Sequence, residues 1–559
     1  METAPVSPAQ RDLWIADRVG TAGAALHTAE AVELSGAADI AALRRAVREI
    51  VRRHQVLRST IVMVDGEPRQ RVQPNWDIPV RIVDLADACS GGGNSDWLRH
   101  PDARKLVDEP FDLATQYPIR GSVFRLAPDR LGLLVVVHHI ASDMMSAEIL
   151  LTELSDLYGA FEKGQSSPLP ELTCQYAEVA AQQHTSMTGP YLDEHVRYWQ
   201  ERLTNLPAPL DLALGSLRPH MVSARGAVVR LPLDEDVARA VHTFAGSERV
   251  TVFTIALAAY HLTLAAYTGD RDILVAVPSV QREDELSARL IGCFLNTLVL
   301  REYIDERLSV REFIESVWST VTEALEYREL SYSRVIELAS PPRRPGFRPL
   351  TQVGFTAAEA KTGELAFGSL RGRPLSIDRD SIAYDLMATV LVSSDALDVV
   401  FEYCVDVLNE QMVERMTQTF RDILRQMCSA PDAPLNALLT AGRPADTYPR
   451  RPAAPLADHQ TPEGLGEAGQ EDADPVIQRL AGLWEEALGV PEVHPEDDFF
   501  ACGGHSLALI ALMMKIEETF AVELPLSEVL QTPSLREQAR LIGRHIPVES
   551  SEGHGSAVS

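Results

Sequence analysis

The sequence predicts a mixed α/β region followed by a small all-α domain, and three observations support this prediction. The chain has 559 residues, beyond the size at which a single hydrophobic core stops growing, so we expect two to four domains. Strand-like and helix-like segments interleave through residues 1–439, whereas residues 475–545 show helical periodicity alone. Residues 440–474 and 546–559 lack apolar periodicity, which predicts a disordered linker and a disordered tail.

The α/β region is predicted to form two lobes of similar size, residues 1–180 and 181–439, divided near the polar stretch QQHTSMTG. In the first lobe, apolar spacing predicts a helix over residues 41–54. The Val-rich run over residues 131–138 predicts a strand that is buried on both faces. In the second lobe the patterns predict a long helix, two strands and a late helix, over residues 250–267, 273–277, 396–403 and 410–427.

Residues 475–545 are expected to form four short helices around a small core. Apolar residues recur at three- and four-residue steps over residues 476–488, which predicts one amphipathic helix. A second helix is predicted over residues 506–520. A last helix is predicted to follow Thr532 as its N-cap, with Pro533 in the first turn.

Composition excludes several classes of protein. The chain carries 51 Lys and Arg against 80 Asp and Glu, a net charge of −29, and no basic patch, so we expect no nucleic-acid partner. The N-terminus does not resemble a signal peptide, and no apolar run approaches 18 residues, so we expect a cytoplasmic protein with no membrane partner. The six cysteines form no CxxC pair, which argues against a disulfide framework or a zinc site.

The most informative pattern of the α/β region is VVVHHIASDMM, in which a buried strand ends at His138 and His139 and a turn carries Asp143. Neighbouring strand residues point to opposite faces, so only one histidine faces a given cavity. Histidine is the usual residue for proton transfer near neutral pH, and N–H groups at the start of the following helix are expected to stabilise negative charge nearby. Two alternatives stay open: a hydrogen-bonded pair of structural histidines, and a metal site.

This pattern resembles HHxxxDG, the signature of condensation domains of nonribosomal peptide synthetases, which belong to the chloramphenicol acetyltransferase-like superfamily. Five further segments resemble motifs of that family, in the family's order. They are Ser7–Arg11 with Leu13–Trp14 (SxAQxRLW), Arg53–Ser59 (RHExLRT), Tyr198–Trp199 with Leu206–Pro207 (YW…LP), Ile291–Thr297 with Arg301 (IGxFxNTxxxR), and Arg348–Leu350 (the end of RDxSRNPL). On these six matches, about 425 residues are identified as a member of this family.

The resemblance implies two acetyltransferase-like lobes arranged in a V, with a tunnel between them that His139 faces. There His139 would act as general base toward an attacking amine, or would position that amine by hydrogen bonding. His138 and Asp143 would be structural, and Arg282 is the candidate partner of Asp143. Asn296 would be a structural or a channel residue.

Two departures from the family pattern concern the substrate. Met144 occupies the position of the motif's glycine, and methionine permits unusual backbone angles and close substrate approach less easily than glycine. The aligned HQDxPFE motif is poorly kept, because residues 327–333 are YRELSYS. The resemblance therefore gives the least information about the channel through which the acceptor would enter.

A second pattern, DDFFACGGHSL, places Ser506 after two glycines at the start of a predicted helix. A serine there serves as an N-cap or as the attachment point of a phosphate-bearing group. A GxSxG nucleophile elbow would need a preceding buried strand, which is absent. The segment resembles the FFxxGGHSL motif of peptidyl carrier domains, which implies a 4′-phosphopantetheine arm on Ser506.

The order of these parts implies partners. No adenylation domain lies between the two regions, so we expect a stand-alone adenylation enzyme to load Ser506 in trans, after a phosphopantetheinyl transferase has added the arm. Because the first motif lies so near residue 1, we expect an upstream carrier on another polypeptide, and a downstream carrier is left open. The expected reaction is amide formation between a donor thioester and the acceptor on Ser506. Acyl transfer with a diffusible amine, alcohol or coenzyme A thioester and a catalytically silent recruitment platform are the alternatives.

Overall fold

The computed structural model describes most of the chain, in two compact units made mainly of residues 21–450 and 451–559. The residues that it does not describe are 1–2, 20–22, 75, 77–79, 87–95, 215–216, 220–221, 283–284, 343, 345, 360–363, 378–379, 394–395, 443–474, 489, 491, 500–501, 503–505, 523, 530–531, 533 and 546–559. Most of the predicted linker and the whole predicted tail therefore lie outside the described residues.

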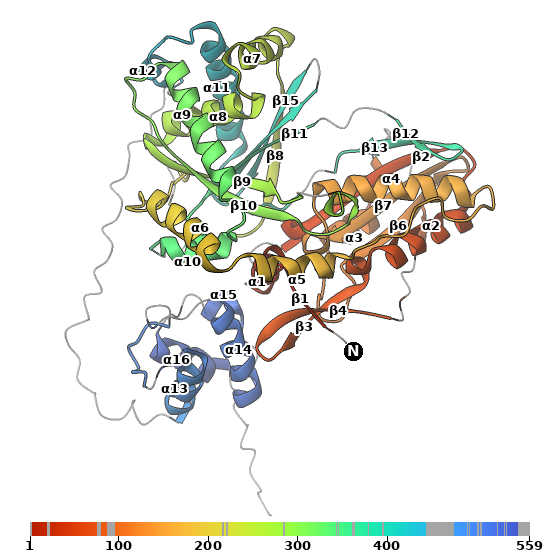
Figure 1. Cartoon of the computed structure of the whole chain (residues 1–559), viewed down its shortest axis with the longest axis horizontal. Helices are drawn as coiled ribbons and strands as arrows, with labels where there is room; N and C mark the ends of the chain where they lie inside the picture. The colour runs from red at the N-terminus through yellow and green to blue at the C-terminus, as the bar shows by residue number, and fades with distance from the viewer. Residues whose placement is uncertain are drawn as a thin grey trace, which may run out of the picture. The chain divides into compact units, whose positions relative to one another are not determined.

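The larger unit contains two six-stranded sheets, one in each lobe (Figure 1). The first sheet has the strand order β12 (Leu365–Phe367), β13 (Leu370–Leu375), β2 (His27–Ser35), β7 (Arg130–His138), β6 (Ile119–Ala127) and β5 (Arg81–Asp84). The second has the order β10 (Leu295–Tyr303), β9 (Asp272–Val280), β11 (Val353–Glu359), β14 (Leu386–Val392), β15 (Leu397–Cys404) and β8 (Gly226–Pro232). A small sheet is formed by β1 (Ala4–Pro5), β4 (Glu67–Val72) and β3 (Ser59–Val64).

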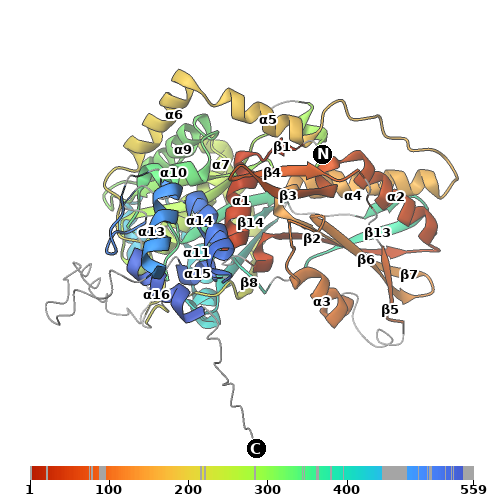
Figure 2. The ribbon, with the colours of Figure 1, turned by 90° about the horizontal axis from the view of Figure 1, so that it is seen from below.

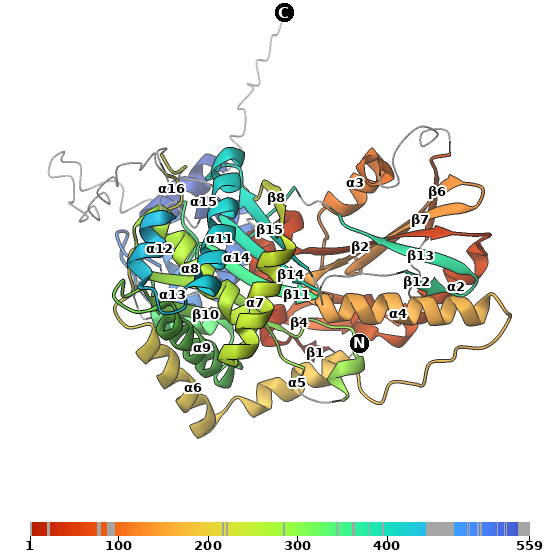
Figure 3. The same cartoon turned by 90° about the horizontal axis from the view of Figure 1, so that it is seen from above.

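Helices cover both sheets. Those of the first lobe are α1 (Pro8–Val19), α2 (Ile40–Arg53), α3 (Pro101–Asp108) and α4 (Met144–Phe161), and α2 packs against α4. Those of the second lobe are α7 (Glu235–Glu248), α8 (Val252–Thr268), α9 (Val310–Glu326), α10 (Tyr332–Ala339), α11 (Glu410–Ser429) and α12 (Leu435–Ala441). Two helices, α5 (Tyr176–Ser186) and α6 (Gly189–Arg202), run one after the other along one side of the unit, as Figures 2 and 3 show.

The apolar runs of the sequence form the centres of the two lobes. In β7, which pairs with β2 on one side and β6 on the other, every residue from Leu131 to His138 is buried, so side chains on both faces of the strand are covered. In α8 every residue from Thr254 to Ala266 is buried, and the helix contacts α7, α9, α11 and the second sheet. The strand predicted over 131–138 and the helix predicted over 250–267 are thereby confirmed.

A hairpin from late in the chain joins the first sheet. Strands β12 and β13 follow β11 of the second lobe, yet β13 pairs antiparallel with β2, with Arg371 opposite Ser35 and Leu375 opposite Ala31. The hairpin lies in the predicted second lobe by its position in the sequence but in the first sheet by its pairing, so a single division of the chain at residue 180 does not separate the two lobes. The first lobe completes its sheet with residues that the sequence patterns assign to the second.

In its described residues the smaller unit contains four helices, α13 (Pro475–Leu488), α14 (Ser506–Phe520), α15 (Leu526–Val529) and α16 (Leu535–His545). Trp484 is buried at its centre, where its Nε1–H donates to Gln538 at 3.0 Å. The predicted N-cap of the last helix is wrong. Ser534 caps α16 in a reciprocal pair with Glu537, whereas the Thr532 hydroxyl donates to carbonyl oxygens of the preceding turn. Pro533 lies outside the described residues.

Among the described residues, no single helix has the length and apolarity to cross a membrane. The pair α7 and α8, bent by 111° at the break between them, meets that requirement together, by length and composition only.

Candidate active site

The candidate site forms where β7 ends. His138 is the last residue of β7, residues His139–Ala141 make a single 3-10 turn, and α4 begins at Met144. Asp143 is the N-cap of α4, because its Oδ1 accepts the N–H of Ser146 at 2.7 Å. One of the N–H groups at the start of α4, that of Ser146, therefore already binds the chain's own carboxylate.

His138 is fully buried and fixes the turn that follows it. Its Nδ1 accepts the N–H of Ile140 at 3.0 Å, so the ring proton is on Nε2, which lies 3.6 Å from Oδ1 of Asp17. The ring also packs edge-on against His27 and Phe111. His27 is neutral near pH 7 because burial lowers its pKa to about 4. This environment is that of a structural histidine.

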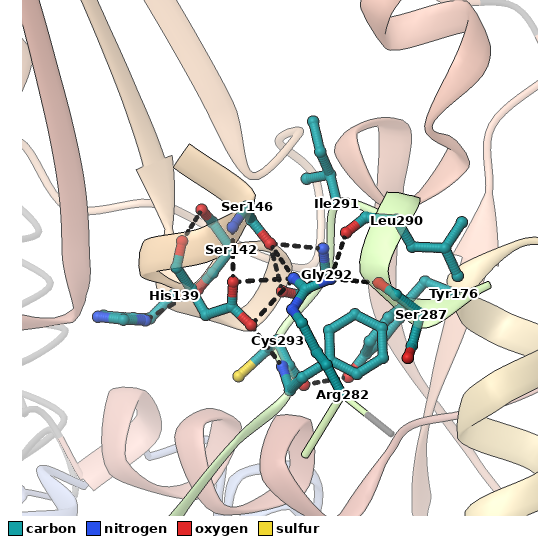
Figure 4. A network of polar contacts seen from close by, with 12 residues as sticks. His139, Ser142, Ser146, Tyr176, Arg282, Ser287, Leu290, Ile291, Gly292 and Cys293 are labelled. Atoms are coloured by element: carbon teal, nitrogen blue, oxygen red, sulfur yellow. Dashed lines mark hydrogen bonds and ion pairs between the residues drawn. The ribbon is translucent and has the colours of Figure 1, made fainter. Parts of the chain in front are cut away.

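His139 is half-buried and has a defined tautomer. Its Nδ1 lies 2.9 Å from the carbonyl oxygen of Ser142, and a carbonyl only accepts, so Nδ1 carries a proton and, in the neutral ring, Nε2 carries the lone pair. Figure 4 shows the His139 ring pointing away from the polar cluster around Arg282. This geometry gives His139 an imidazole nitrogen that can accept a proton or a hydrogen bond. Among the described residues, no three His, Cys, Asp or Glu side chains are grouped to hold a metal ion.

Asp143 joins the two lobes through a buried ion pair. Arg282, in the segment that follows β9, places Nη2 at 2.9 Å from Oδ1 of Asp143, and the two side chains are 3% and 0% exposed. The second carboxylate oxygen accepts the N–H of Phe294 at 3.1 Å. The contact between Asp143 and Arg282 that the resemblance implies is therefore present.

Ser146 is a third member of this cluster, and it was missed by the sequence analysis (Figure 4). Its Oγ donates to the carbonyl of Gly292 at 2.8 Å and accepts from Arg282 Nη2 at 2.8 Å and from the N–H of Gly292 at 3.0 Å. Arg282 also donates to the carbonyls of Ser287 and Leu290, and its guanidinium lies 4.1 Å from the centre of the Phe294 ring. The sequence contained one signal for Ser146, because it follows Asp143 by three residues and so lies on the same face of the helix.

His54, from the RHQVLRS segment, makes a second connection to the same loop. Its Nδ1 accepts the N–H of Ile291 at 3.3 Å, and its Nε2–H donates to Glu153 at 2.8 Å. Burial lowers the pKa of His54, so the ring is neutral and the charge partner of Glu153 is Arg53, at 2.9 Å. Burial alone would raise the pKa of Glu153, but the hydrogen bonds from His54 and Arg53, together with the charge of Arg53, lower it overall.

Asn296 is fully hydrogen-bonded within the second lobe. Its Nδ2 donates to the carbonyls of Arg328 and Leu330 at 2.6 and 2.7 Å. Its Oδ1 accepts the N–H groups of Thr297 and Tyr332 at 2.9 and 3.1 Å. Three of these four contacts hold the YRELSYS segment against β10 and the fourth lies within β10, so the geometry favours the structural interpretation over the channel interpretation.

Met144 occupies an ordinary helical position. It is the first residue of α4, and it is not among the residues with a positive φ, so the backbone here does not require glycine. Its side chain is 46% exposed. The departure from the motif therefore adds side-chain volume beside the His139 turn without straining the backbone.

Ser506 is the first residue of α14, a helix of 15 residues. The loop before it is anchored by buried Phe499, which packs edge-on against Trp484 with ring centres 5.0 Å apart. The carbonyl of Asp497 accepts the N–H of Leu535 at 3.1 Å, which connects this loop to the start of α16. The N–H groups at the start of a helix favour an anionic group, so this end of α14 suits a phosphodiester.

Two family models match the chain. Residues 1–444 match the model described as Condensation domain, and residues 478–542 match the one described as Phosphopantetheine attachment site. The chain belongs to the condensation-domain family. It is a condensation domain followed by a carrier domain of the nonribosomal peptide synthetase type, as the motifs predicted. Its cofactor is covalent 4′-phosphopantetheine, and the helix start at α14 fits the phosphate of that group.

Curated relatives of this condensation–carrier chain are large synthetases. Malpinin synthetase of Mortierella alpina is 30% identical over 433 residues, which cover 78% of this chain and 6% of the relative. Chondramide synthase cmdD of Chondromyces crocatus is 31% identical over 429 residues, which cover 77% of this chain and 11% of the relative. Phosphinothricin tripeptide synthetase PhsB of Streptomyces viridochromogenes is 29% identical over 511 residues, which cover 86% of this chain and 42% of the relative. The chain spans less than half the length of each of these relatives.

Solved structures support the fold of the condensation domain. The X-domain from teicoplanin biosynthesis is 22% identical with a TM-score of 0.70, over 78% of this chain and 97% of that one. The first condensation domain of the calcium-dependent antibiotic synthetase, in complex with a substrate analogue, is 21% identical with a TM-score of 0.66, over 78% and 98%. With the two sheets and the helical carrier domain, these likenesses confirm the predicted fold class.

Proposed function

We propose that the chain forms an amide bond between an acyl or peptidyl thioester on a partner carrier and an aminoacyl acceptor held on Ser506, with His139 at the reacting atoms. The observation that supports this most directly is the tautomer of His139. Its Nδ1–H is committed to the Ser142 carbonyl, so the basic Nε2 belongs to a side chain held by a buried turn at the end of β7.

The proposed chemistry gives His139 one proton to move. As the acceptor amine attacks the thioester carbonyl, the C–N bond forms and Nε2 of His139 accepts the proton that the nitrogen loses. The C–S bond breaks and the proton passes to the leaving sulfur, so His139 ends the cycle neutral. The phosphopantetheine arm on Ser506, when attached, supplies the thiol that carries the acceptor. Asp143 and Arg282 keep the two lobes together around this turn.

Substitution of His139 by alanine tests this role. We expect the rate of amide formation to fall by about 10²-fold or more, because proton transfer by a positioned side chain contributes about 10²- to 10⁴-fold. The measurement is product formation from loaded donor and acceptor carriers, followed by mass spectrometry. His242→Ala is the matched control, since His242 is also half-buried but lies on α7.

Unchanged turnover in His139→Ala would remove the histidine-dependent mechanism. No turnover in the parent chain, under conditions in which both carriers are loaded, would favour the silent platform. Product formed from a free amine instead of a carrier-bound one would favour the diffusible-substrate alternative.

Modification of Ser506 is tested by intact mass. With a phosphopantetheinyl transferase and coenzyme A, the chain should gain one phosphopantetheine and Ser506→Ala should gain none. Ser534→Ala should gain one, because Ser534 belongs to the same carrier domain but caps α16. A gain in Ser506→Ala would overturn this attachment site.

We also propose that a separate adenylating enzyme loads the arm. Only residues 445–477 lie between the two family matches, too few for a folded adenylation domain of several hundred residues. In the same mass assay, the modified chain with ATP and amino acids should acquire an aminoacyl group only after an adenylating enzyme is added. Acylation without that enzyme would contradict loading in trans.

A further inference from the structure

The backbone on either side of Ile140, the residue after His139, is held by two buried side chains. The N–H of Ile140 donates to His138 Nδ1 at 3.0 Å, and its carbonyl accepts from Gln10 Nε2 at 3.0 Å. His138 is 0% exposed and Gln10 is 1% exposed. Because a peptide group is planar, fixing the planes on both sides of Ile140 also fixes the Cα of His139, from which the imidazole projects.

Gln10 has a second set of contacts that fixes its own orientation. Its Oε1 accepts the N–H of Ser7 at 3.0 Å, and its backbone N–H donates to Ser7 Oγ at 3.0 Å. Ser7 and Gln10 thus form a reciprocal cap at the start of α1. With Oε1 committed to Ser7, the amide nitrogen must face Ile140, where it acts as a donor.

The same cap is connected to the second lobe. The hydroxyl of Tyr176 donates to the carbonyl of Cys293 at 2.5 Å, so the Ser7 hydroxyl, 2.7 Å away, donates to the oxygen of Tyr176. Burial raises the pKa of Tyr176 well above its ordinary value, which keeps this hydroxyl protonated and able to donate. Gln10 therefore lies between the His139 turn and a buried chain of donors that reaches the loop before β10.

We propose that Gln10 is a positioning residue for His139, which it holds through the carbonyl of Ile140 so that Nε2 meets the reacting amine. This inference rests on the proposed function of His139 and adds to it. It assigns to the glutamine of the SPAQ segment a role that motif matching alone did not supply. Gln10 touches neither substrate nor cofactor in this role, and acts only through the turn.

Gln10→Glu separates the two sets of contacts. Glutamate keeps the acceptor that caps α1, but its carboxylate cannot donate to Ile140. At neutral pH we expect kcat for amide formation to fall by about 10- to 100-fold, with KM for the donor carrier changed by less than about two-fold, because a small displacement of a reacting group lowers the rate more than it lowers binding.

The pH dependence distinguishes positioning from a loss of stability. Burial raises the pKa of a glutamate, so the new side chain becomes protonated as the pH falls, and its O–H then donates to Ile140 as the amide did. The ratio of kcat in Gln10→Glu to kcat in the parent should therefore rise between about pH 8 and about pH 6. Gln10→Met has no donor at any pH, and its ratio should stay low and flat.

Gln70→Glu is the matched control. Gln70 is also 1% exposed, lies in the first lobe and donates to a backbone carbonyl, that of Pro5, at 2.7 Å. The Gln70→Glu variant should lose about as much stability as Gln10→Glu, measured by denaturant unfolding, and should keep the kcat of the parent chain. Equal kcat values in the Gln10→Glu and Gln70→Glu variants, with His139→Ala inactive, would overturn this inference alone. Full turnover in His139→Ala would overturn the proposed function itself. If Gln10→Glu does not fold, Gln10→Met against Gln70→Met makes the same comparison.

Discussion

Arg282→Met is expected to lower the free energy of unfolding by about 3–5 kcal/mol, because it leaves the carboxylate of Asp143 buried without its charge partner. Asp143 is 0% exposed, so water cannot replace the lost guanidinium, and within the described part of the chain only the N–H groups of Ser146 and Phe294 still donate to its carboxylate. Amide formation should be lost with stability, since Asp143 ends the turn that carries His139. The measurement is chemical denaturation of the parent and the variant under identical conditions.

A second change should recover part of this loss. In the double variant Asp143→Asn with Arg282→Met the buried charge is gone, and asparagine still caps α4. We expect the double variant to be more stable than Arg282→Met alone. Arg239→Met serves as the control, because its pair with Glu235 is exposed and is worth less than about 1 kcal/mol. A double variant less stable than the single one would contradict the uncompensated-charge argument.

Gly292→Ala is expected to destabilise the condensation domain by about 1–3 kcal/mol or more, through lack of space. A Cβ at this position would lie 2.1 Å from Cδ2 and 2.5 Å from Cε2 of Tyr176, well inside contact distance. The Tyr176 ring would have to move, and its hydroxyl would leave Ser7 and Cys293. The loss is measured by the same denaturation experiment, together with kcat.

Gly246→Ala is the matched control for this substitution. Gly246 lies on α7, and an added Cβ there meets nothing within 4 Å. Since alanine favours helix more than glycine does, this variant should be as stable as the parent or more stable, by up to about 1 kcal/mol. A loss in Gly246→Ala as large as that in Gly292→Ala would contradict the steric explanation.

Elements with a strong local pattern could be predicted from the sequence. The strand expected over residues 131–138 is β7, which is a continuous apolar run, and the helix expected over residues 410–427 is α11, in which apolar residues recur at helical spacing. The cap of α16 was an avoidable error. Thr532 and Ser534 are both good N-caps, but only Ser534 has a glutamate three residues later, the sign of a capping box.

Contacts between distant segments could not be predicted in the same way. The contact of Asp143 with Arg282 was expected only because a family resemblance supplied it. The contact of Gln10 with Ile140 joins residues 130 positions apart, and nothing in the local pattern of either segment indicates the other. Polar residues of a buried network do not recur at a regular spacing along the sequence, so the partner of each one can be identified only from the folded structure.

The late hairpin has a consequence for how the protein is made. On a ribosome, β2 emerges early, but the strand that covers its free edge does not exist until β13 has been synthesised, and Glu33 and Arg373 on these strands are 340 residues apart. Until then the nascent first lobe presents an unpaired edge, which is a template for pairing with other chains. Folding of this lobe is therefore completed only after most of the second lobe has been translated, so the lobes mature together even though each has its own core.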